Sequence, residues 1–143
     1  MNSNIFIYWD VHSKKEYLLK AFIEIYLAQK NIDVVLIDPK MIEFEDFKND
    51  CYYWYVIHEF EDFKNKFNTL KNIESKKIII INEIADFIYN KDTYNDFLSI
   101  INYIKSTKNM NFIISTQRNI NCNDYSNKLD SILNDNYLIK LIF

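Results

Sequence analysis

The sequence predicts an α/β fold, a three-layer sandwich with a mostly parallel central sheet between helices. The segment Lys77–Asp86 (KIIIINEIAD) contains a continuous isoleucine run, which is typical of a strand buried on both faces of a parallel sheet. Apolar strand-like segments also alternate with amphipathic helical segments along the chain. With 143 residues, 49% of them hydrophobic, the chain is predicted to form one domain over residues 1–143.

Composition excludes several classes of protein. The chain has no glycine, one proline and a single arginine, a bias that indicates AT-rich coding and suggests a bacterial or mobile-element source. A net charge of −3 predicts no general attraction to nucleic acid. No stretch is long enough to span a membrane and no signal peptide is recognisable, so we expect a cytoplasmic protein. Cys51 and Cys122 are far apart and are expected to be reduced thiols, and no metal site is predicted.

The first half of the chain is predicted to form three strands and two helices. Leu18, Phe22 and Ile25 recur at helical spacing, so one helix follows the first strand. Pro39 ends the second strand, because proline cannot donate to a sheet. The predicted strands are Asn4–Trp9, Asp33–Asp38 and Tyr52–Ile57. The first predicted helix follows the segment Asp10–Glu16 and extends to about Lys30, and the second covers Glu59–Asn72.

The second half begins with the isoleucine strand and continues the alternation. Phe97, Ile101 and Ile104 form the apolar face of the next helix. A further strand and a short helix precede a final apolar segment, YLIKLIF, at the end of the sequence. The predicted elements are a helix at about Asp92–Ser106, a strand at Asn111–Ser115, a short helix near Asn127–Leu133 and a strand at Tyr137–Phe143.

The first strand and helix are joined by a loop in the position of a phosphate-binding loop, whose pattern is G-x-x-x-x-G-K-[ST]. On this pattern Trp9 and Lys14 occupy the glycine positions, Lys15 the lysine position and Glu16 the hydroxyl position. Glycine allows backbone N–H groups to approach phosphate closely, with no Cβ in the way. Trp9 and Lys14 have a Cβ, and Glu16 adds a negative charge, so the sequence predicts a damaged phosphate loop.

A structural explanation also accounts for part of this loop. Ser13 and Glu16 form an S-x-x-E capping box, in which Ser13 caps the helix and Glu16 reaches back to it. A carboxylate of the protein itself would then occupy the positive end of the helix, where phosphate binds in nucleotide-binding proteins. We favour this capping interpretation over a working phosphate loop.

Four segments, in order, resemble the FtsK/SpoIIIE motor domain, a hexameric DNA translocase of the RecA-like P-loop NTPase class. They are LIDPKMIEF, IIIINEIADFI, NFIISTQRN and ILNDNYLIKLIF, and together they extend over most of the chain. The resemblance implies a RecA-like P-loop fold that binds ATP and Mg²⁺. It also implies that Glu83 is the catalytic glutamate and Gln117 the sensor of the γ-phosphate, while Lys15 contacts phosphate and Arg118 follows the sensor.

The chain departs from this family at positions that matter for hydrolysis. Asn82 stands where the family has a Mg²⁺-coordinating aspartate, and Glu16 stands where it has Ser or Thr. The family's loop glycines fall on Trp9, His12 and Lys14. The candidate catalytic residues are therefore Glu83 and Gln117, and the candidate nucleotide-binding residues are Ser13, Lys15, Glu16, Asn82 and Arg118.

Three functions remain open from the sequence. The preferred one is a degenerate pseudo-ATPase domain, with binding of ATP and Mg²⁺ weak or lost, that acts with a protein partner or by self-association and binds DNA weakly. The second is an active ATP-dependent DNA translocase or packaging ATPase. The third is an unrelated α/β protein-interaction module. In a RecA-type sheet we expect the first strand to lie between the strands that end at Glu83 and Gln117, and another order would favour the third function.

Overall fold

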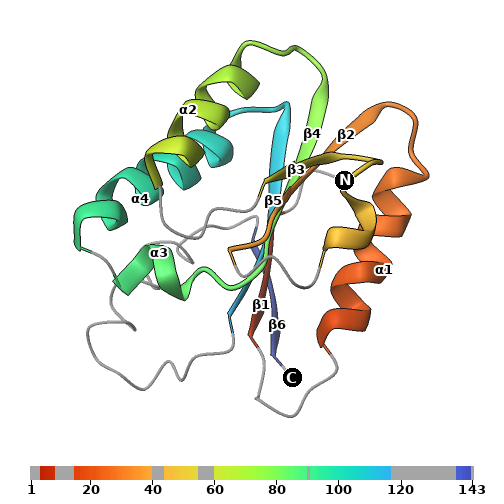
Figure 1. Ribbon diagram of the computed structural model, residues 1–143, viewed down its shortest axis with the longest axis horizontal. Coiled ribbons are helices and arrows are strands. Elements are labelled where there is room, and N and C mark those ends of the chain that lie inside the picture. Colours follow the sequence, from red (N-terminus) through yellow and green to blue (C-terminus); the bar gives the residue numbers. More distant parts are fainter. Residues whose placement is uncertain are drawn as a thin grey trace.

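The structure, a computed structural model, describes residues 4–8, 15–39, 44–54, 60–89, 91–116 and 138–142. Strands and helices alternate along the chain in these segments (Figure 1). The strands are β1 (Asn4–Tyr8), β2 (Ile32–Ile37), β3 (Tyr52–Trp54), β4 (Lys76–Ile81), β5 (Met110–Thr116) and β6 (Leu138–Ile142). The helices are α1 (Lys15–Leu27), the 3-10 helix η1 (Glu45–Phe47), α2 (Phe60–Lys71), α3 (Ala85–Tyr89) and α4 (Lys91–Ser106).

The strands form one six-stranded sheet in the order β3-β2-β4-β5-β1-β6, and every pair of neighbours is parallel. Helix α1 covers one face of this sheet, whereas α2, α3 and α4 cover the other (Figure 1). The predicted α/β three-layer sandwich is therefore confirmed.

The expected position of the first strand is wrong. β1 pairs with β5 on one side and β6 on the other, so β5 separates β1 from β4. Because the chain crosses over a sheet face between parallel strands, the order depends on long-range packing rather than on the residues of each strand. The consequence is that the strand ending in Thr116 lies directly between β1 and the strand that precedes Glu83.

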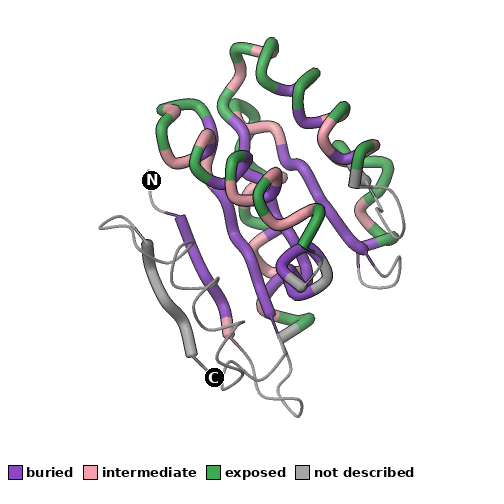
Figure 2. The backbone as a smooth tube through the Cα atoms, turned by 90° about the vertical axis from the view of Figure 1, so that its left-hand side faces the viewer, coloured by how far each residue is buried: buried purple, intermediate pink, exposed green. Residues whose placement is uncertain are grey.

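The isoleucine run of β4 is buried on both faces, as the sequence predicts. Ile79 and Ile81 pack on the side of α2 and α4, while Ile78 and Ile80 pack on the side of α1. Successive side chains of a strand point to opposite faces, so a strand between two helical layers must be apolar throughout. Figure 2 shows the central strands buried along their length, while the helices alternate between buried and exposed positions.

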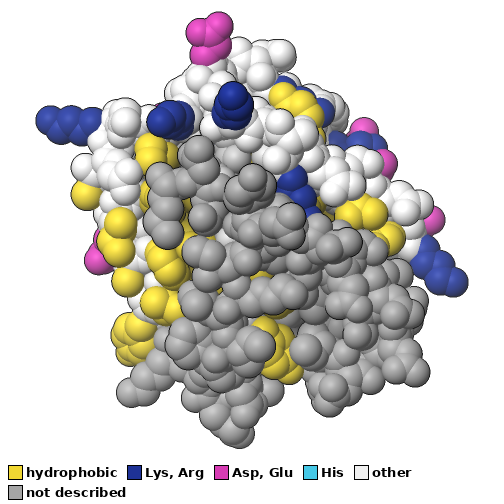
Figure 3. All heavy atoms as spheres, turned by 180° about the vertical axis from the view of Figure 1, so that it is seen from behind, with side chains coloured by type: hydrophobic (Ala, Val, Ile, Leu, Met, Phe, Trp, Pro, Cys, Tyr) yellow, Lys and Arg dark blue, Asp and Glu magenta, His cyan; other side chains and the backbone are white. Residues whose placement is uncertain are grey.

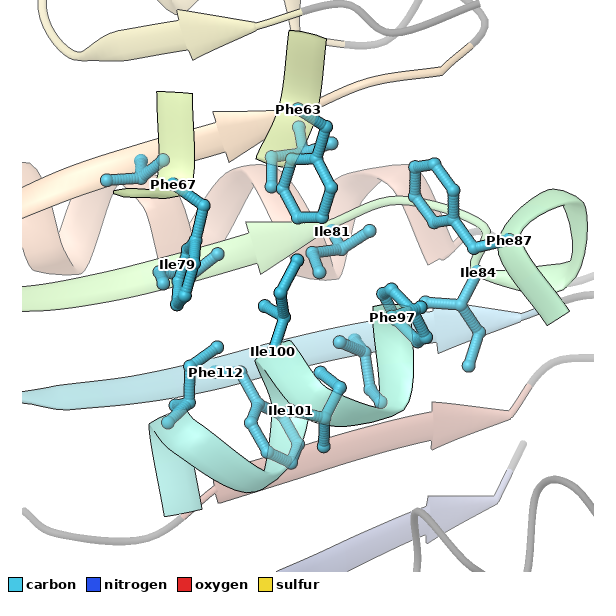
Figure 4. Close-up of a cluster of buried hydrophobic side chains, with 14 of the residues drawn as sticks. Phe63, Phe67, Ile79, Ile81, Ile84, Phe87, Phe97, Ile100, Ile101 and Phe112 are labelled. Carbon is cyan, nitrogen blue, oxygen red and sulfur yellow. The ribbon is translucent and has the colours of Figure 1, made fainter. Parts of the chain in front are cut away.

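Three phenylalanine rings link α2, α3 and α4 on one face of the sheet (Figure 4). The ring centroids of Phe63 and Phe87 are 5.6 Å apart, and those of Phe87 and Phe97 are 5.2 Å apart, with both pairs stacked. All three side chains are buried. The middle ring belongs to α3, a five-residue helix that the sequence analysis did not predict. Its shortness explains the omission, because five residues do not establish a helical periodicity.

The remaining predicted elements agree with the structure to within a few residues where they are described. β3 is described over Tyr52–Trp54, the beginning of the predicted strand, and β6 confirms the last predicted strand. α1 begins at Lys15, within the segment that was expected to precede the helix, and ends at Leu27. The short helix predicted near Asn127–Leu133 lies outside the described residues. Among the described helices, none is both long and apolar enough to cross a bilayer.

Candidate functional site

The carboxyl ends of β4 and β5 bring a set of polar side chains together. Asn82 and Glu83 follow β4 directly, while Ser115 and Thr116 are the last residues of β5. The two strands are neighbours in register, with Ile81 opposite Ile114. All four polar residues are buried, none more than 2% exposed. This is the edge at which open α/β sheets bind ligands.

Ser115 organises the turn that follows β4. Its hydroxyl donates to Oδ1 of Asn82 at 3.2 Å and accepts from the backbone N–H of Glu83 at 3.3 Å. Its carbonyl oxygen accepts from the N–H of Ile84 at 3.0 Å. On the other side, the N–H of Asn82 donates to the carbonyl of Ile37 on β2 at 3.0 Å. The turn is therefore held by both neighbouring strands.

Glu83 combines an unusual backbone conformation with a buried carboxylate. Its φ of 59° lies in the left-handed region, which costs a residue with a Cβ roughly 1–2 kcal/mol. Oε1 accepts from the Thr116 hydroxyl at 2.8 Å and from the N–H of Ala85 at 3.1 Å. Ala85 is the first residue of α3, so the carboxylate bonds an N–H that has no partner within the helix. These interactions hold the carboxylate inward and stabilise the strained turn.

Asp38 is a fifth buried polar residue at the same edge, and no sequence pattern assigned it a role. It directly follows β2, it is fully buried, and its Oδ2 accepts from the N–H of Phe44 at 3.2 Å. This bond fixes the start of the segment that carries η1. The segment LIDPKMIEF contained the signal, because a carboxylate directly after a buried strand lies at the carboxyl edge of the sheet.

The structure describes only part of the predicted site. Asn82 and Glu83 lie together at the strand end, as expected for neighbours in sequence. Lys15 is the first residue of α1, and Glu16 is exposed in the first turn of that helix. Ser115 and Thr116, whose hydroxyls bond Asn82 and Glu83, were not among the candidate residues, although the segment NFIISTQRN contains both. Ser13, Gln117 and Arg118 lie outside the described residues, as do Trp9, His12 and Lys14.

The described residues do not fit a Mg²⁺ site. Magnesium in nucleotide-binding proteins is held by carboxylate or hydroxyl oxygens and phosphate. Asn82 is neutral and its oxygen already accepts from Ser115, while the Glu83 carboxylate bonds Thr116 and Ala85. Within the described part of the chain, no group of three or more His, Cys, Asp or Glu residues could hold a metal ion.

No family model matches the sequence, and a search of curated proteins found no match. Solved structures match over nearly the whole chain. The Orc1 protein of Aeropyrum pernix in complex with DNA has a TM-score of 0.66 at 10% identity, and the match covers 99% of this chain and 39% of that protein. AMPPCP-bound DnaA from Aquifex aeolicus has a TM-score of 0.60 at 18% identity, covering 97% of this chain and 40% of DnaA.

The cytoplasmic domain of EssC is similar as well, with a TM-score of 0.62 at 12% identity, covering 99% of this chain and 31% of that protein. The chain thus spans less than half the length of each of these neighbours. The position of β1 differs from the expected one, and the solved structures match the fold over nearly all of the chain. At these identities the comparison concerns the fold alone, and this chain has the α/β fold of the P-loop NTPases.

Proposed function

We propose that this chain is a degenerate FtsK/SpoIIIE-like pseudo-ATPase domain that has lost hydrolysis and acts as a binding or assembly partner in a DNA transfer or mobile-element system. The observation that carries this proposal is the buried polar cluster at the end of β4. In that cluster, the neutral Asn82 and the inward Glu83 are bonded to β5 and α3.

Charge and geometry at this cluster both oppose phosphoryl transfer. Catalysis of that reaction depends almost entirely on positioning and on neutralising the developing negative charge. Asn82 supplies no carboxylate for a metal ion, and the first turn of α1 carries the carboxylate of Glu16 where a phosphate would bind. The residues at the glycine positions of the loop also oppose phosphate binding, because each has a Cβ.

The proposed role in DNA transfer rests on the family resemblance and on the solved structures that share this fold. Three of the similar structures are described as complexes with DNA, those of Orc1, of Drosophila ORC with Cdc6 and of DnaA with single-stranded DNA. The AT-rich coding adds support for a mobile-element source. The partner would be a protein or a second copy of the chain, with DNA bound weakly.

The first test is calorimetric titration of the purified chain with Mg²⁺–ATP. We expect no binding at millimolar nucleotide, because neither the phosphate loop nor Asn82 retains the required groups. Release of inorganic phosphate, with and without DNA, should stay at background.

The proposal fails if ATP binds at micromolar concentration and Lys15→Ala abolishes that binding. It also fails if phosphate release exceeds background and is lost in Glu83→Gln, a change that keeps the size of the side chain and removes its charge. Circular dichroism of both variants shows whether a loss reflects unfolding.

An active ATP-dependent DNA translocase is the second candidate, and one observation favours it. Glu83 is held at the carboxyl edge of the sheet by Thr116, where a carboxylate could orient an attacking water. In this case DNA should stimulate phosphate release, and Asn82→Asp should increase it further by restoring a metal ligand.

A further inference from the structure

Helix α1 carries apolar side chains on the side that faces away from the sheet. Tyr17 is 70% exposed and Ile25 is 56% exposed, which is unusual for large hydrophobic side chains of the described chain. Hydrophobic side chains gather along the left-hand edge of Figure 3, where α1 lies once the view of Figure 1 is turned by 180°. Single exposed apolar residues need no explanation, whereas a continuous apolar surface indicates a contact with another molecule.

The exposed residues of α1 form a row because of their spacing. Tyr17, Ala21 and Ile25 are four residues apart, so they lie next to one another along the helix. The opposite face of the helix is formed by Leu19 and Ile23, which are fully buried against the sheet. A helix at the surface normally has polar residues opposite its buried face. α1 instead has apolar residues on both faces.

The two sides of this row differ in chemistry. One turn of an α-helix is 3.6 residues, so Lys20 and Glu24 lie together on one side of the row. Nζ of Lys20 is also 3.5 Å from Oδ2 of Asp46 on η1. Leu18 and Phe22 lie on the other side, where both are half-buried and pack against the core. The row is therefore bordered by a pair of opposite charges on one side and by apolar side chains on the other.

A second copy of α1, running antiparallel to the first, matches this pattern. With a two-fold axis beside Ala21, Tyr17 of one copy lies opposite Ile25 of the other, because both are four residues from Ala21. The symmetry keeps each side of the row on its own side, so Lys20 of one copy lies beside Glu24 of the other. The small side chain of Ala21 at the centre allows the two helices to approach closely. A parallel pair would instead place Lys20 beside its own copy.

The charges of this face favour a second copy over a lipid surface. Helices that lie on membranes have an excess of Lys and Arg, which bind anionic lipid. On α1, Glu16 and Glu24 are exposed, and Lys20 is paired with Asp46. The net charge of −3 also opposes attraction to lipid phosphates. A second copy, in contrast, offers an opposite charge for both Lys20 and Glu24.

We propose that α1 is a homodimerisation surface, on which Tyr17, Ala21 and Ile25 of two copies pack antiparallel while Lys20 and Glu24 pair between the copies. A helix of 13 residues is about 20 Å long, so the contact is small and the dimer should be weak. The inference goes beyond the proposed function, because pairing through α1 requires no particular state of the strand-end cluster. The titration with Mg²⁺–ATP and the measurement of dimers therefore fail or succeed separately.

Sedimentation equilibrium of the purified chain tests this proposal. We expect the mean mass to rise with concentration from that of one chain toward that of two, with a dissociation constant between about 10 µM and 1 mM. Ile25→Glu should weaken dimerisation at least about tenfold, because the symmetric contact would then contain two unpaired carboxylates. Asn102→Glu, at an exposed position of α4, adds the same charge and should dimerise as the unmodified chain does.

Two charge variants test the pairing between the copies. Lys20→Glu and Glu24→Lys each place like charges beside one another in the antiparallel pair, so each variant alone should dimerise less than the unmodified chain. An equal mixture of the two variants restores opposite charges at both contacts and should recover the dimer. Circular dichroism shows whether the variants are folded.

Three outcomes would overturn the proposal. The first is a chain that stays monomeric up to about 1 mM, well above the range of weak protein interfaces. The second is equal dimerisation of Ile25→Glu and Asn102→Glu, which would place the interface elsewhere. The third is binding of the monomeric chain to phosphatidylglycerol vesicles that Ile25→Glu abolishes, which would assign this face of α1 to a lipid surface.

Discussion

Asn82 and Glu83 show that residues at the end of a strand can preserve a fold without preserving a catalytic role. An amide and a carboxylate have nearly the same shape, so Asn82 can remain in a buried turn that a metal-binding aspartate would also fit. Its oxygen then accepts a hydrogen bond from Ser115. Glu83 is bonded by Thr116 and Ala85. In our proposal, these residues stabilise the turn after β4 and do not act on a nucleotide.

The bond between Thr116 and Glu83 leads to a prediction about stability. Thr116→Val keeps the shape of the side chain but removes the donor at 2.8 Å from the buried carboxylate. Because a hydrogen bond to a charged, buried group is lost, the free energy of unfolding should fall by about 1.5–3 kcal/mol. Urea denaturation followed by circular dichroism measures this change.

Thr69→Val is the matched control for this prediction. Thr69 is exposed on α2, and its hydroxyl donates to the carbonyl of Asn65 at 3.2 Å. The same substitution there should change the free energy of unfolding by no more than about 0.5 kcal/mol. Equal effects of the two variants would show that the carboxylate does not depend on Thr116.

At the scale of the elements, α3 connects the strand-end turn to the helical layer. This five-residue helix begins immediately after the Glu83–Ile84 turn. Phe87, in its middle, is stacked between Phe63 of α2 and Phe97 of α4. A helix of this length is not stable alone in water, so its packing holds it in place. We therefore expect the position of Asn82 and Glu83 to depend on the stacking of Phe87 between α2 and α4.

Phe87→Ala should test this dependence. Phe87 is 4% exposed, and its removal leaves a cavity between two rings, so the free energy of unfolding should fall by about 3–5 kcal/mol. Tyr17→Ala on α1 removes an aromatic ring that is 70% exposed and should change stability by no more than about 0.5 kcal/mol. A loss of less than about 1 kcal/mol for Phe87→Ala would mean that α3 is not anchored by this ring.

At the scale of the whole molecule, net charge predicts the response to DNA. The chain carries −3, and non-specific affinity for DNA comes from neutralising backbone phosphates with Lys and Arg. We expect a dissociation constant weaker than about 1 µM at physiological salt. Fluorescence anisotropy of a labelled duplex measures it. A submicromolar value that weakens steeply with salt would instead indicate a cationic surface strong enough to overcome the net charge.

The sequence by itself determined the strands and the three longer helices of the described fold, and it placed Asn82 and Glu83 at the end of the isoleucine strand. Periodicity belongs to consecutive residues, so KIIIINEIAD could be assigned to a strand buried on both faces, followed by Asn82 and Glu83. The same reasoning identified α1, α2 and α4, because each carries an apolar face at helical spacing. It omitted α3, which is too short to show such a face.

Only the tertiary structure decided which segments are neighbours. The sheet order β3-β2-β4-β5-β1-β6 places Ser115 and Thr116 beside Asn82 and Glu83. The crossover connections of a parallel sheet allow several orders for the same set of strands, and none of them is encoded in the period of a single strand. The packing of helices on both faces selects one order, and that order determines which polar side chains meet.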